Sequence, residues 1–416
     1  MARKKTLPLI EDFDNIPEAA LVPEDEQPYE IPTHWRWVRL GTVLNPMETR
    51  KPSGNYFTYI DIDAIDNNTQ TIAKPKEIAT IKAPSRASRG VRPGDTLFSL
   101  VRPYLMNIAF VEAQFSEAIA STGFYVCSPI EAVDQRYLFH MLSSSSFVNR
   151  ATEWMRGDNS PSIKSSDFVQ LPVPLPPIDE QKAIAVYIEQ THTKIDDAIQ
   201  RLDAFLDDFP NRRFDLVRAL LAGHGLPDHG GDPKQQWETL PLGEILRVSS
   251  GCGLTAKEMN SSGTVPVYGG NGITGYHDQA CYPAGTIAIG RVGFYCGSVH
   301  MSLEECWVTD NALVASFDEN QIDRRFLYFL LGHTNLRINT SSSAQPLISG
   351  KKIYDIPVNI PSRDTQKAIV KHVEASLEYL DRIETLAVKS RDELTGLRAL
   401  VVQQALQGAF AASPIR

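Results

Sequence analysis

The chain has 416 residues and a net charge of −9, and 42% of its residues are hydrophobic and 22% are charged. This length accommodates two or three domains of ordinary globular composition. No apolar run is long enough to cross a membrane. The five cysteines are an odd number and include no C-x-x-C pair, so we expect neither a disulfide scaffold nor a zinc site of the common spacing. We therefore expect a cytoplasmic protein without a metal ion or a membrane partner.

The N-terminal segment, residues 1–30, is strongly acidic. It contains eight acidic residues against three basic ones, together with several prolines. A segment of this kind is typical of extended chain, so the sequence predicts an acidic N-terminal arm.

A first body, residues 31–177, is predicted to be mostly β-structure. Aromatic and β-branched runs at 57–65 and 94–101 are typical of strands, and an amphipathic helix follows at about 134–153. The stretch 81–104 holds five basic residues against one acid, Asp95. Such a stretch is either a solvated loop or a surface for phosphate and guanine, which arginine binds well. The candidate nucleic-acid contacts here are Lys82, Arg86, Arg89, Arg92, Arg102 and Tyr104.

A long helix is predicted over residues 178–222. Prolines crowd just before it, and Asp179 and Glu180 suit the positive end of a helix dipole. Its apolar residues alternate at spacings of four and three, which is typical of a coiled-coil seam. We expect a kink or a change of packing partner at Pro210. The seam residues are Ile184, Ile188, Ile195, Leu202, Phe205 and Phe209.

A Gly/Pro-rich linker, residues 223–236, leads to a second body at 237–361. Strand-like runs at 263–268, 285–295 and 311–318 and an amphipathic helix at 322–333 give it the same composition as the first body. A P-D…D-P-K string in the linker mimics a nuclease motif. Nuclease carboxylates need rigid neighbouring strands, so we attribute this string to chance.

A second long helix, 362–410, precedes a short tail, 411–416, and repeats the first helix. Residues 171–184, LPVPLPPIDEQKAI, return as IPVNIPSRDTQKAI at 356–369, and the offset of 185 residues holds from Pro161 to Gly223. The two helices pair most simply antiparallel, with one body at each end. The first seam spans about 38 Å at ~1.5 Å per residue, which is close to one turn of B-DNA. The second seam contains Ile369, Val373, Leu380, Ile383 and Leu394, and Gly396 weakens it as Pro210 weakens the first.

The string Gly270–Gly275 is a literal G-x-G-x-x-G. A dinucleotide-binding loop needs a helix after the glycines, but the sequence that follows has Pro283 and no helical period. We interpret the string as a β-hairpin with Asn271-Gly272 as its turn signal. Asparagine can bind adenine through two hydrogen bonds, although Asn271 can equally be only a turn residue. The candidate contacts in this body are Tyr268, Asn271, Thr274, Tyr276, His277, Arg291, Lys351 and Lys352.

Several motifs together resemble the specificity subunits of type I restriction–modification systems, the HsdS family. These are the W-x-x-x-x-L-G openings at Trp35 and Trp237, the YGGNGITGY, GDTLFS and GTIAIGR segments, the LP-x-P-x-PP…EQ junction and the terminal ALQGAF. The resemblance covers essentially the whole chain, and only the length of the acidic arm departs from it. It implies an α+β fold in which two pseudo-twofold-related, mostly-β target recognition domains are separated by two long antiparallel helices forming a coiled coil.

The resemblance also implies a function and partners. Each domain would read one half of a split, asymmetric site in double-stranded DNA, and the helices would set the spacer and dock two methyltransferase subunits. The chain would be a non-catalytic subunit without a cofactor. S-adenosylmethionine would belong to the methyltransferase, and ATP and magnesium would belong to a restriction/translocase subunit. The sequence leaves open a methylation-only complex and, less favoured, a nucleotide- or S-adenosylmethionine-binding enzyme.

Overall fold

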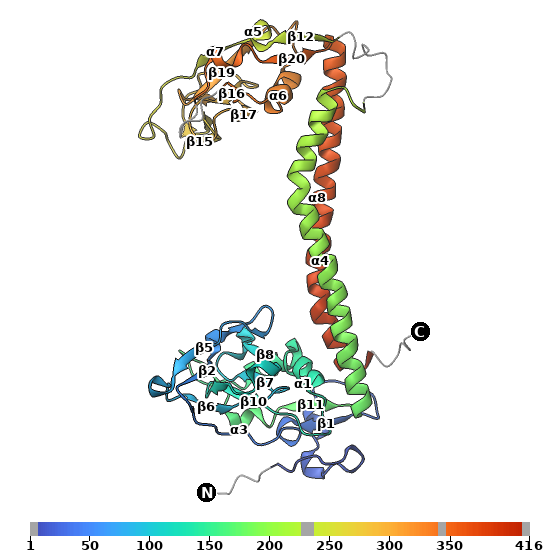
Figure 1. Cartoon of the computed structure of the whole chain (residues 1–416). Coiled ribbons are helices and arrows are strands. Elements are labelled where there is room, and N and C mark those ends of the chain that lie inside the picture. The colour runs from blue at the N-terminus through green and yellow to red at the C-terminus, as the bar shows by residue number, and fades with distance from the viewer. Residues whose placement is uncertain (1–6, 226–236, 340–346, 410–416) are drawn as a thin grey trace. The chain divides into compact units, whose positions relative to one another are not determined.

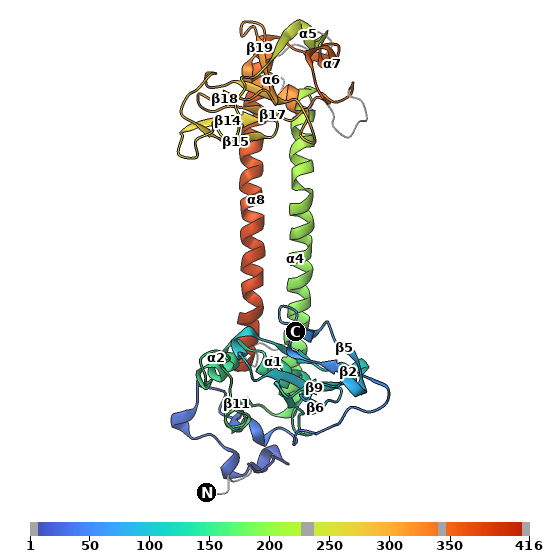
Figure 2. The ribbon, with the colours of Figure 1, turned by 90° about the vertical axis from the view of Figure 1, so that its left-hand side faces the viewer.

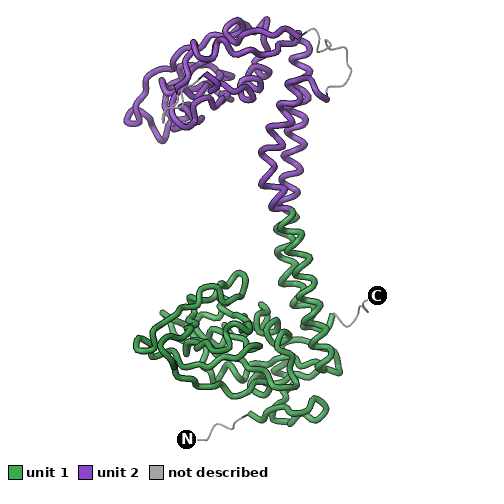
Figure 3. The backbone as a smooth tube through the Cα atoms, viewed as in Figure 1, with its two compact units in different colours: residues 1–201, 390–416 green, residues 202–389 purple. Residues whose placement is uncertain are grey.

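The computed structural model describes residues 7–225, 237–339 and 347–409. The chain forms two compact units, one of residues 1–201 with 390–416 and one of residues 202–389 (Figure 3). Two long helices, α4 (Ile178–Leu221) and α8 (Arg363–Leu406), each contribute to both units. The predicted α+β class, with two mostly-β bodies and two long antiparallel helices, is confirmed. No helix of the described residues has the length and apolar character needed to cross a bilayer.

The first body contains two larger sheets and a short ribbon. The ribbon pairs β1 (Arg36–Arg39) antiparallel with β11 (Pro172–Leu175). One sheet has the order β5-β2-β9-β6 and the other has the order β10-β7-β8. Their strands are β2 (Tyr56–Ile60), β5 (Lys76–Ala79), β6 (Ala87–Gly90), β7 (Thr96–Ser99), β8 (Ile108–Phe110), β9 (Ile119–Ser121) and β10 (Phe124–Cys127), beside a small β3–β4 pair at Ile65–Asp66 and Thr71–Ile72.

The helix expected at 134–153 is two helices, α1 (Gln135–Leu142) and α2 (Ser145–Glu153). The break falls at Ser144, whose hydroxyl accepts a hydrogen bond from Phe147 N and so caps α2. Serine at this position competes with the continuing helix by satisfying a free backbone donor. A third, one-turn helix, α3 (Ser165–Phe168), precedes β11.

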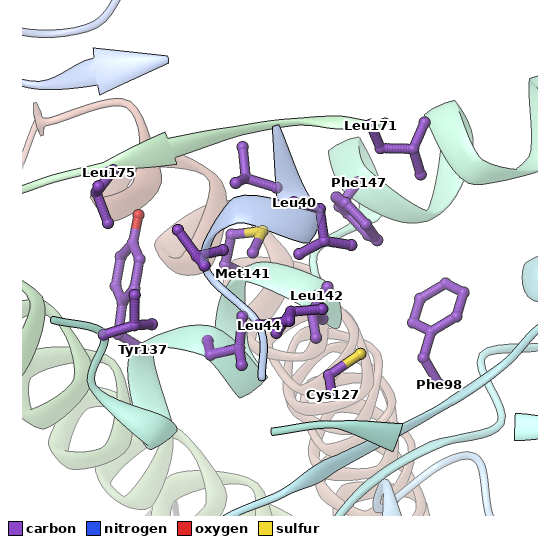
Figure 4. Close-up of a cluster of buried hydrophobic side chains, with 14 of the residues drawn as sticks. Leu40, Leu44, Phe98, Cys127, Tyr137, Met141, Leu142, Phe147, Leu171 and Leu175 are labelled. Carbon is purple, nitrogen blue, oxygen red and sulfur yellow. The ribbon is translucent and has the colours of Figure 1, made fainter. Parts of the chain in front are cut away.

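The core of the first unit joins the body to both long helices. Figure 4 shows side chains of this cluster, including Leu40, Phe98 and Tyr137. The Tyr137 hydroxyl donates a hydrogen bond to the Pro174 carbonyl at 2.8 Å, which satisfies the one polar atom of this buried ring. The long helices add Ile184, Ala185 and Ile188 from α4 and Val402, Ala405 and Leu406 from α8.

The N-terminal segment differs from the extended arm that the sequence predicted. Ile10 N donates to Thr42 O and Val22 N donates to Trp37 O, each at 3.0 Å. Ile10 and Ala20 are buried in the core of the first unit. Apolar residues spaced between the acids therefore hold residues 7–22 against the body, which charge counting alone does not detect.

The second unit repeats this arrangement. A ribbon pairs β12 (Glu238–Pro241) with β20 (Pro357–Ile360), and two sheets have the orders β13-β19-β16-β17 and β15-β14-β18. The remaining elements are β13 (Leu246–Ser250), β14 (Val265–Gly269), β15 (Gly272–His277), β16 (Ile287–Gly290), β17 (Val299–Met301), β18 (Trp307–Val308), β19 (Ala312–Phe317), α5 (Leu242–Ile245), α6 (Arg324–Gly332) and α7 (Gly350–Ile353). The strand expected at 285–295 ends at Gly290, where the chain turns into a loop.

The pairing patterns identify equivalent strands in the two units. β2 pairs parallel with β9 and antiparallel with β5, just as β14 pairs parallel with β18 and antiparallel with β15. The sheet β10-β7-β8 likewise matches β19-β16-β17. The internal repeat inferred from the sequence is therefore a repeat of topology as well.

Within each unit, a part of α4 lies beside a part of α8 (Figures 1 and 2). In the first unit, Arg398 Nη1 lies 2.7 Å from Asp196 Oδ1, and the His192 ring contacts the Arg398 carbonyl at 3.1 Å. In the second unit, Arg213 pairs with Asp381 and Glu384. The helix α4 continues through Pro210, and after it Val217, Leu220 and Leu221 join the core of the second unit.

Most of the linker expected at 223–236, and the tail expected at 411–416, lie outside the described residues.

Candidate nucleic-acid interface

The repeated motifs position the bodies on the long helices. Gln181 and Gln366 are almost fully buried. Each amide oxygen accepts a hydrogen bond from the backbone N–H of an aspartate, Asp134 at 2.9 Å or Asp323 at 2.7 Å. Each amide nitrogen donates to two backbone carbonyls, those of Ala132 and Pro176 or those of Gln321 and Pro361. The glutamine of the QKAI motif is therefore a structural clamp.

The clamped aspartates cap a helix of each body. Asp134 accepts from the first N–H groups of α1, and Asp323 does the same for α6. The same first turn adds an ion pair to the long helix, between Arg136 and Glu189 in one unit and between Arg325 and Glu374 in the other. This shared framework fixes the start of each long helix relative to its body. The loops at the other edges of the sheets are not part of it, so they can differ between the two bodies.

The tryptophans of the two openings are not equivalent. Trp35 Nε1 donates to Glu180 Oε2 at 2.8 Å, whereas Thr365 replaces this glutamate in the second unit. Trp237 Nε1 is buried without a hydrogen-bond partner among the described residues.

Four of the basic candidates of the first body lie around β6. Lys82 follows β5 and Arg86 precedes β6, and both side chains are exposed. Neither has an ion-pair partner in the part of the chain that the structure describes. Arg89 is half-buried on β6, where its Nε lacks a hydrogen-bond partner among the described residues. Lys82 and Arg86 are therefore the cations most available to a phosphate.

Arg92 is less available than its sequence position indicates. Its Nη2 lies 2.9 Å from Glu48 Oε2, and the other oxygen of Glu48 accepts from Arg50 Nε at 3.0 Å. Hydrogen bonds from Arg50 and Arg92 lower the pKa of Glu48, so this carboxylate stays charged and partly neutralises both arginines. Sequence reasoning missed Arg50 and Glu48 because they lie outside the basic stretch.

Arg102 and Tyr104 lie in the loop between β7 and β8. Arg102 adopts a left-handed backbone conformation with φ 47°, and its Nη2 donates to the Asn159 carbonyl at 2.9 Å. The loop begins beside the turn after β9, since Leu100 N donates to Gly123 O and Thr122 N donates to Arg86 O, each at 2.9 Å. The structure therefore brings Arg86 and the β7–β8 loop to the same turn.

The glycine-rich string of the second body is a β-hairpin, as predicted. β14 and β15 pair antiparallel up to Gly269 and Gly272, so the two turn residues are Gly270 and Asn271, one position before the expected pair. Gly272 takes the left-handed conformation, φ 83°. The glycines lead into the strand β15 (Gly272–His277) rather than a helix, so this string lacks the strand–loop–helix geometry of a dinucleotide-binding loop.

The hairpin divides its candidates between surface and core. Asn271, Thr274 and Tyr276 are exposed on the turn and on β15, which is an edge strand. His277 is half-buried, with its ring edge-on to Trp307 at 5.1 Å. Tyr268 is only 7% exposed and packs among Ala288, Cys306 and Val308, so it is a core residue rather than a surface contact.

The hairpin turn lies close to the end of β16. The Gly270 carbonyl accepts a hydrogen bond from Ser298 Oγ at 2.6 Å, and a Cβ added to Gly290 would lie 2.4 Å from that same carbonyl. Arg291 follows Gly290 and is half-buried, with long contacts of 3.3 Å to Ser250 Oγ and 3.4 Å to the Asp310 carbonyl. The structure therefore places Asn271 beside the segment that carries Arg291.

The two candidate lysines of α7 differ in exposure. Lys351 is exposed, whereas Lys352 is half-buried and donates to the Leu347 carbonyl at 2.9 Å. Sequence reasoning missed three large apolar side chains near the candidates that are exposed to solvent. A sequence pattern does not show which part of a strand or loop other elements leave uncovered. Tyr56 is 62% exposed, Ile81 95% and Ile273 50%.

The predicted seam residues fall into two groups. Some are buried, namely Ile184, Ile188, Ile195, Phe209, Ile369 and Val373. The others are half-buried, namely Leu202, Phe205, Leu380, Ile383 and Leu394. Ile184, Ile188, Ile369 and Val373 belong to the body cores, whereas Ile195 and Phe209 lie outside those clusters. The seam therefore joins helix to body at its ends and helix to helix between them. Within the described ranges, no group of three His, Cys, Asp or Glu side chains has the geometry of a metal site.

Comparison with known proteins gives consistent matches. The family described as the type I restriction modification DNA specificity domain matches residues 34–202 and 234–394. The type I restriction enzyme EcoprrI specificity subunit of Escherichia coli is 25% identical over 300 residues, covering 68% of this chain and 67% of that protein. The HsdS subunit from Thermoanaerobacter tengcongensis superposes with a TM-score of 0.68 at 27% identity, over 92% of this chain and 99% of that one. A chain from a structural study of complex assembly and conformational transition of the type I R-M system superposes with a TM-score of 0.65 at 26% identity. The superposition covers 92% of this chain and 100% of that one.

Proposed function

This chain belongs to the family of type I restriction modification DNA specificity proteins, and we propose that each of its two bodies reads one half of a split, asymmetric DNA sequence. The observation that carries the proposal is the combination of a repeated framework with divergent loops. The Gln181 and Gln366 clamps and the sheet orders recur in both units. In contrast, the long excursion between β2 and β5 corresponds to a two-residue turn between β14 and β15. Equal frameworks with unequal loops suit two different half-sites.

The positions of polar and basic side chains support a DNA partner. Exposed Arg86 borders the turn next to the β7–β8 loop, and exposed Lys82 lies four residues before it in the chain. Exposed Asn271 lies beside the segment that carries Arg291. Lysine and arginine contact phosphates, whereas asparagine and arginine can read adenine and guanine in the major groove. Local positive charge in an acidic chain fits a protein whose partners also hold the DNA.

The paired helices support a role in spacing and assembly. Two copies of one framework offer two similar surfaces, which suits two copies of one methyltransferase subunit. In this proposal the chain has no catalytic step. The methyltransferase binds S-adenosylmethionine, and a restriction/translocase subunit that binds ATP and magnesium joins the assembly. The chain would have the same role in a complex that methylates DNA without a restriction subunit.

Methylation mapping of the complex tests the proposal. The wild-type chain, expressed with its methyltransferase partner, should give one bipartite motif with two unequal halves. The double variant Lys82→Ala/Arg86→Ala should weaken DNA binding about equally for all sequences and reduce the salt slope by about two, one for each lost phosphate contact. Lys182→Ala, an exposed lysine on α4, is the control. Methylation without a defined motif, or a continuous motif, would contradict the proposal.

A further inference from the structure

We propose that the loop between β16 and β17, with Phe294 and Tyr295 at its tip, contacts the bases of the half-site read by the second body. This inference rests on the proposed function and goes beyond it, because it assigns residues that no sequence pattern singled out. Its basis is the similarity of this loop, in closing register, outside support and the positions of its left-handed residues, to the loop between β7 and β8 that holds Arg102 and Tyr104.

The two loops close in the same register. β7 and β8 pair from Thr96 with Phe110 to Phe98 with Ile108, and β16 and β17 pair from Ile287 with Met301 to Ile289 with Val299. One residue further, Ser99 N donates to Asn107 O at 3.1 Å, and Gly290 N donates to Ser298 O at 2.8 Å. Seven residues therefore lie between the closing residues in each loop.

The two loops also have the same support from outside. Val101 forms an isolated bridge with Ser162, and Val292, at the equivalent position, forms one with Leu347. Ile163 N donates to Leu100 O at 3.0 Å, and Ile348 N donates to Arg291 O at 2.9 Å. Ser162 and Ile163 are related to Leu347 and Ile348 by the same offset of 185 residues that relates the long helices.

The unusual backbone angles coincide as well. The third and seventh residues of the first loop, counted from Ser99, are Arg102 with φ 47° and Met106 with φ 53°. The third and seventh residues of the second, counted from Gly290, are Gly293 with φ 76° and Gly297 with φ 88°. Left-handed conformations at side-chain-bearing residues cost about 1–3 kcal/mol each and concentrate at functional sites. At the third position the first loop has Arg102, where a glycine such as Gly293 would adopt the same conformation without strain.

A tyrosine stands at the fifth position of both loops. Tyr104 is 48% exposed and Tyr295 is 49% exposed. In the second loop Phe294 is 84% exposed, and its ring lies edge-on to Tyr295 with 5.1 Å between the centroids. Two adjacent exposed aromatic rings are costly in water and indicate a contact surface.

The surroundings of the second loop favour a nucleic-acid partner. Arg291 begins the loop, and the aliphatic part of Arg337 lies against Gly297, where an added Cβ would be 3.1 Å from Cγ. The turn that carries Asn271 is held to Ser298, at the foot of the same loop, by the hydrogen bond from Ser298 Oγ to the Gly270 carbonyl. Aromatic rings beside arginine are typical of surfaces that contact bases, through thymine methyl groups and through base faces.

Half-site-resolved methylation tests this inference in the complete modification complex. The variants are Phe294→Ala/Tyr295→Ala and, in the equivalent loop, Tyr104→Ala. The control is Leu303→Ala, since Leu303 is 83% exposed in the same unit but lies between β17 and β18. We expect each loop variant to lower discrimination by about 10- to 100-fold at bases of its own half-site, to leave the other half unchanged, and the control to behave as wild type.

The outcomes separate this inference from the proposed function. A wild-type complex without a bipartite motif contradicts the proposed function itself. A wild-type bipartite motif that Phe294→Ala/Tyr295→Ala leaves unchanged in sequence and rate overturns only the inference. Loss of methylation with intact DNA affinity and unchanged base preference would also overturn it, because that result would assign the rings to a protein partner.

Discussion

Gln181 and Gln366 show that the most similar residues of the two halves serve the framework. Each side chain uses all three of its hydrogen bonds on backbone groups of its own unit. A buried amide in this position is fully satisfied, whereas its removal would strand one N–H and two carbonyl groups. Sequence similarity between the copies therefore marks the joint between body and helix.

Gln366→Leu should destabilise the second unit by about 3 kcal/mol or more, because unsatisfied buried polar groups cost about 1–3 kcal/mol each. The measurement is the urea midpoint, followed by hydrogen exchange in α6 and the start of α8. Gln404→Leu makes the same chemical change at an exposed position of α8 and should have little effect. Equal midpoints for the two variants would refute the clamp.

The sequence pointed to candidate contact residues, but it did not indicate the surroundings of their side chains. Lys82 and Arg86 of the basic stretch are exposed, as a contact with DNA would require. The basic stretch could not reveal that Glu48, distant in sequence, pairs with Arg92, because that contact depends on the pairing of β6 with the preceding loop. Tyr268 is a candidate because it lies beside the glycines, yet β14 is the central strand of its sheet and is buried on both faces, so the ring lies in the core.

At the scale of elements, the helix α1 brings an unusual histidine against the long helices. His140 is buried, and burial, His192 and Arg136, in that order, lower its pKa to about 3. Its ring lies 6.2 Å from that of His192, which is held by the Arg398 carbonyl. Glu189 Oε1 lies 3.6 Å from Nε2 of His140. His140 is therefore neutral in the folded protein.

Acid should weaken the first unit through this histidine. The pKa of His140 is lower in the folded chain than the usual 6.5, so the unfolded chain binds the proton more tightly. The free energy of unfolding should fall as pH drops from about 6.5 towards 3, by about 1.4 kcal/mol per pH unit from this group. His140→Leu should flatten that slope, measured by denaturant unfolding at several pH values, whereas His372→Gln in the second unit should not. An unchanged slope in His140→Leu would contradict the assignment.

Elements with strong periodic patterns were predicted well, and interrupted ones were not. Both long helices and the Gly270–Asn271 hairpin follow from period and turn chemistry. The helix expected at 134–153 splits at Ser144, because a local side-chain cap competes with propagation and does not alter the hydrophobic period. The packing of residues 7–22 against the body was not predicted, because the few buried apolar residues of this segment have no regular spacing.

At the scale of the whole molecule, the proposal that the helices set the spacer predicts a change in the recognised DNA. One heptad added after Arg201 in α4 and one after Lys389 in α8 keeps the seam in phase and lengthens both helices by about 10.5 Å. The spacer of the methylated motif should grow by about three base pairs, at ~3.4 Å each.

A heptad added to α4 alone is the control for this prediction. It moves Arg213 and the residues after it out of register with Asp381 and Glu384, so it should impair assembly rather than produce a longer spacer. If the paired insertion leaves the spacer unchanged in motif-level mapping, the helices do not set it.

The division of the chain into units has a consequence for its synthesis. The first unit needs Val402, Ala405 and Leu406 to complete its core, and the ribosome adds these residues only after the whole of the second unit. The second unit is continuous, from residue 202 to residue 389. The unit that comes second in the sequence is therefore the first whose chain is complete. The N-terminal body must wait, with its apolar surface open, until these residues of α8 have been translated.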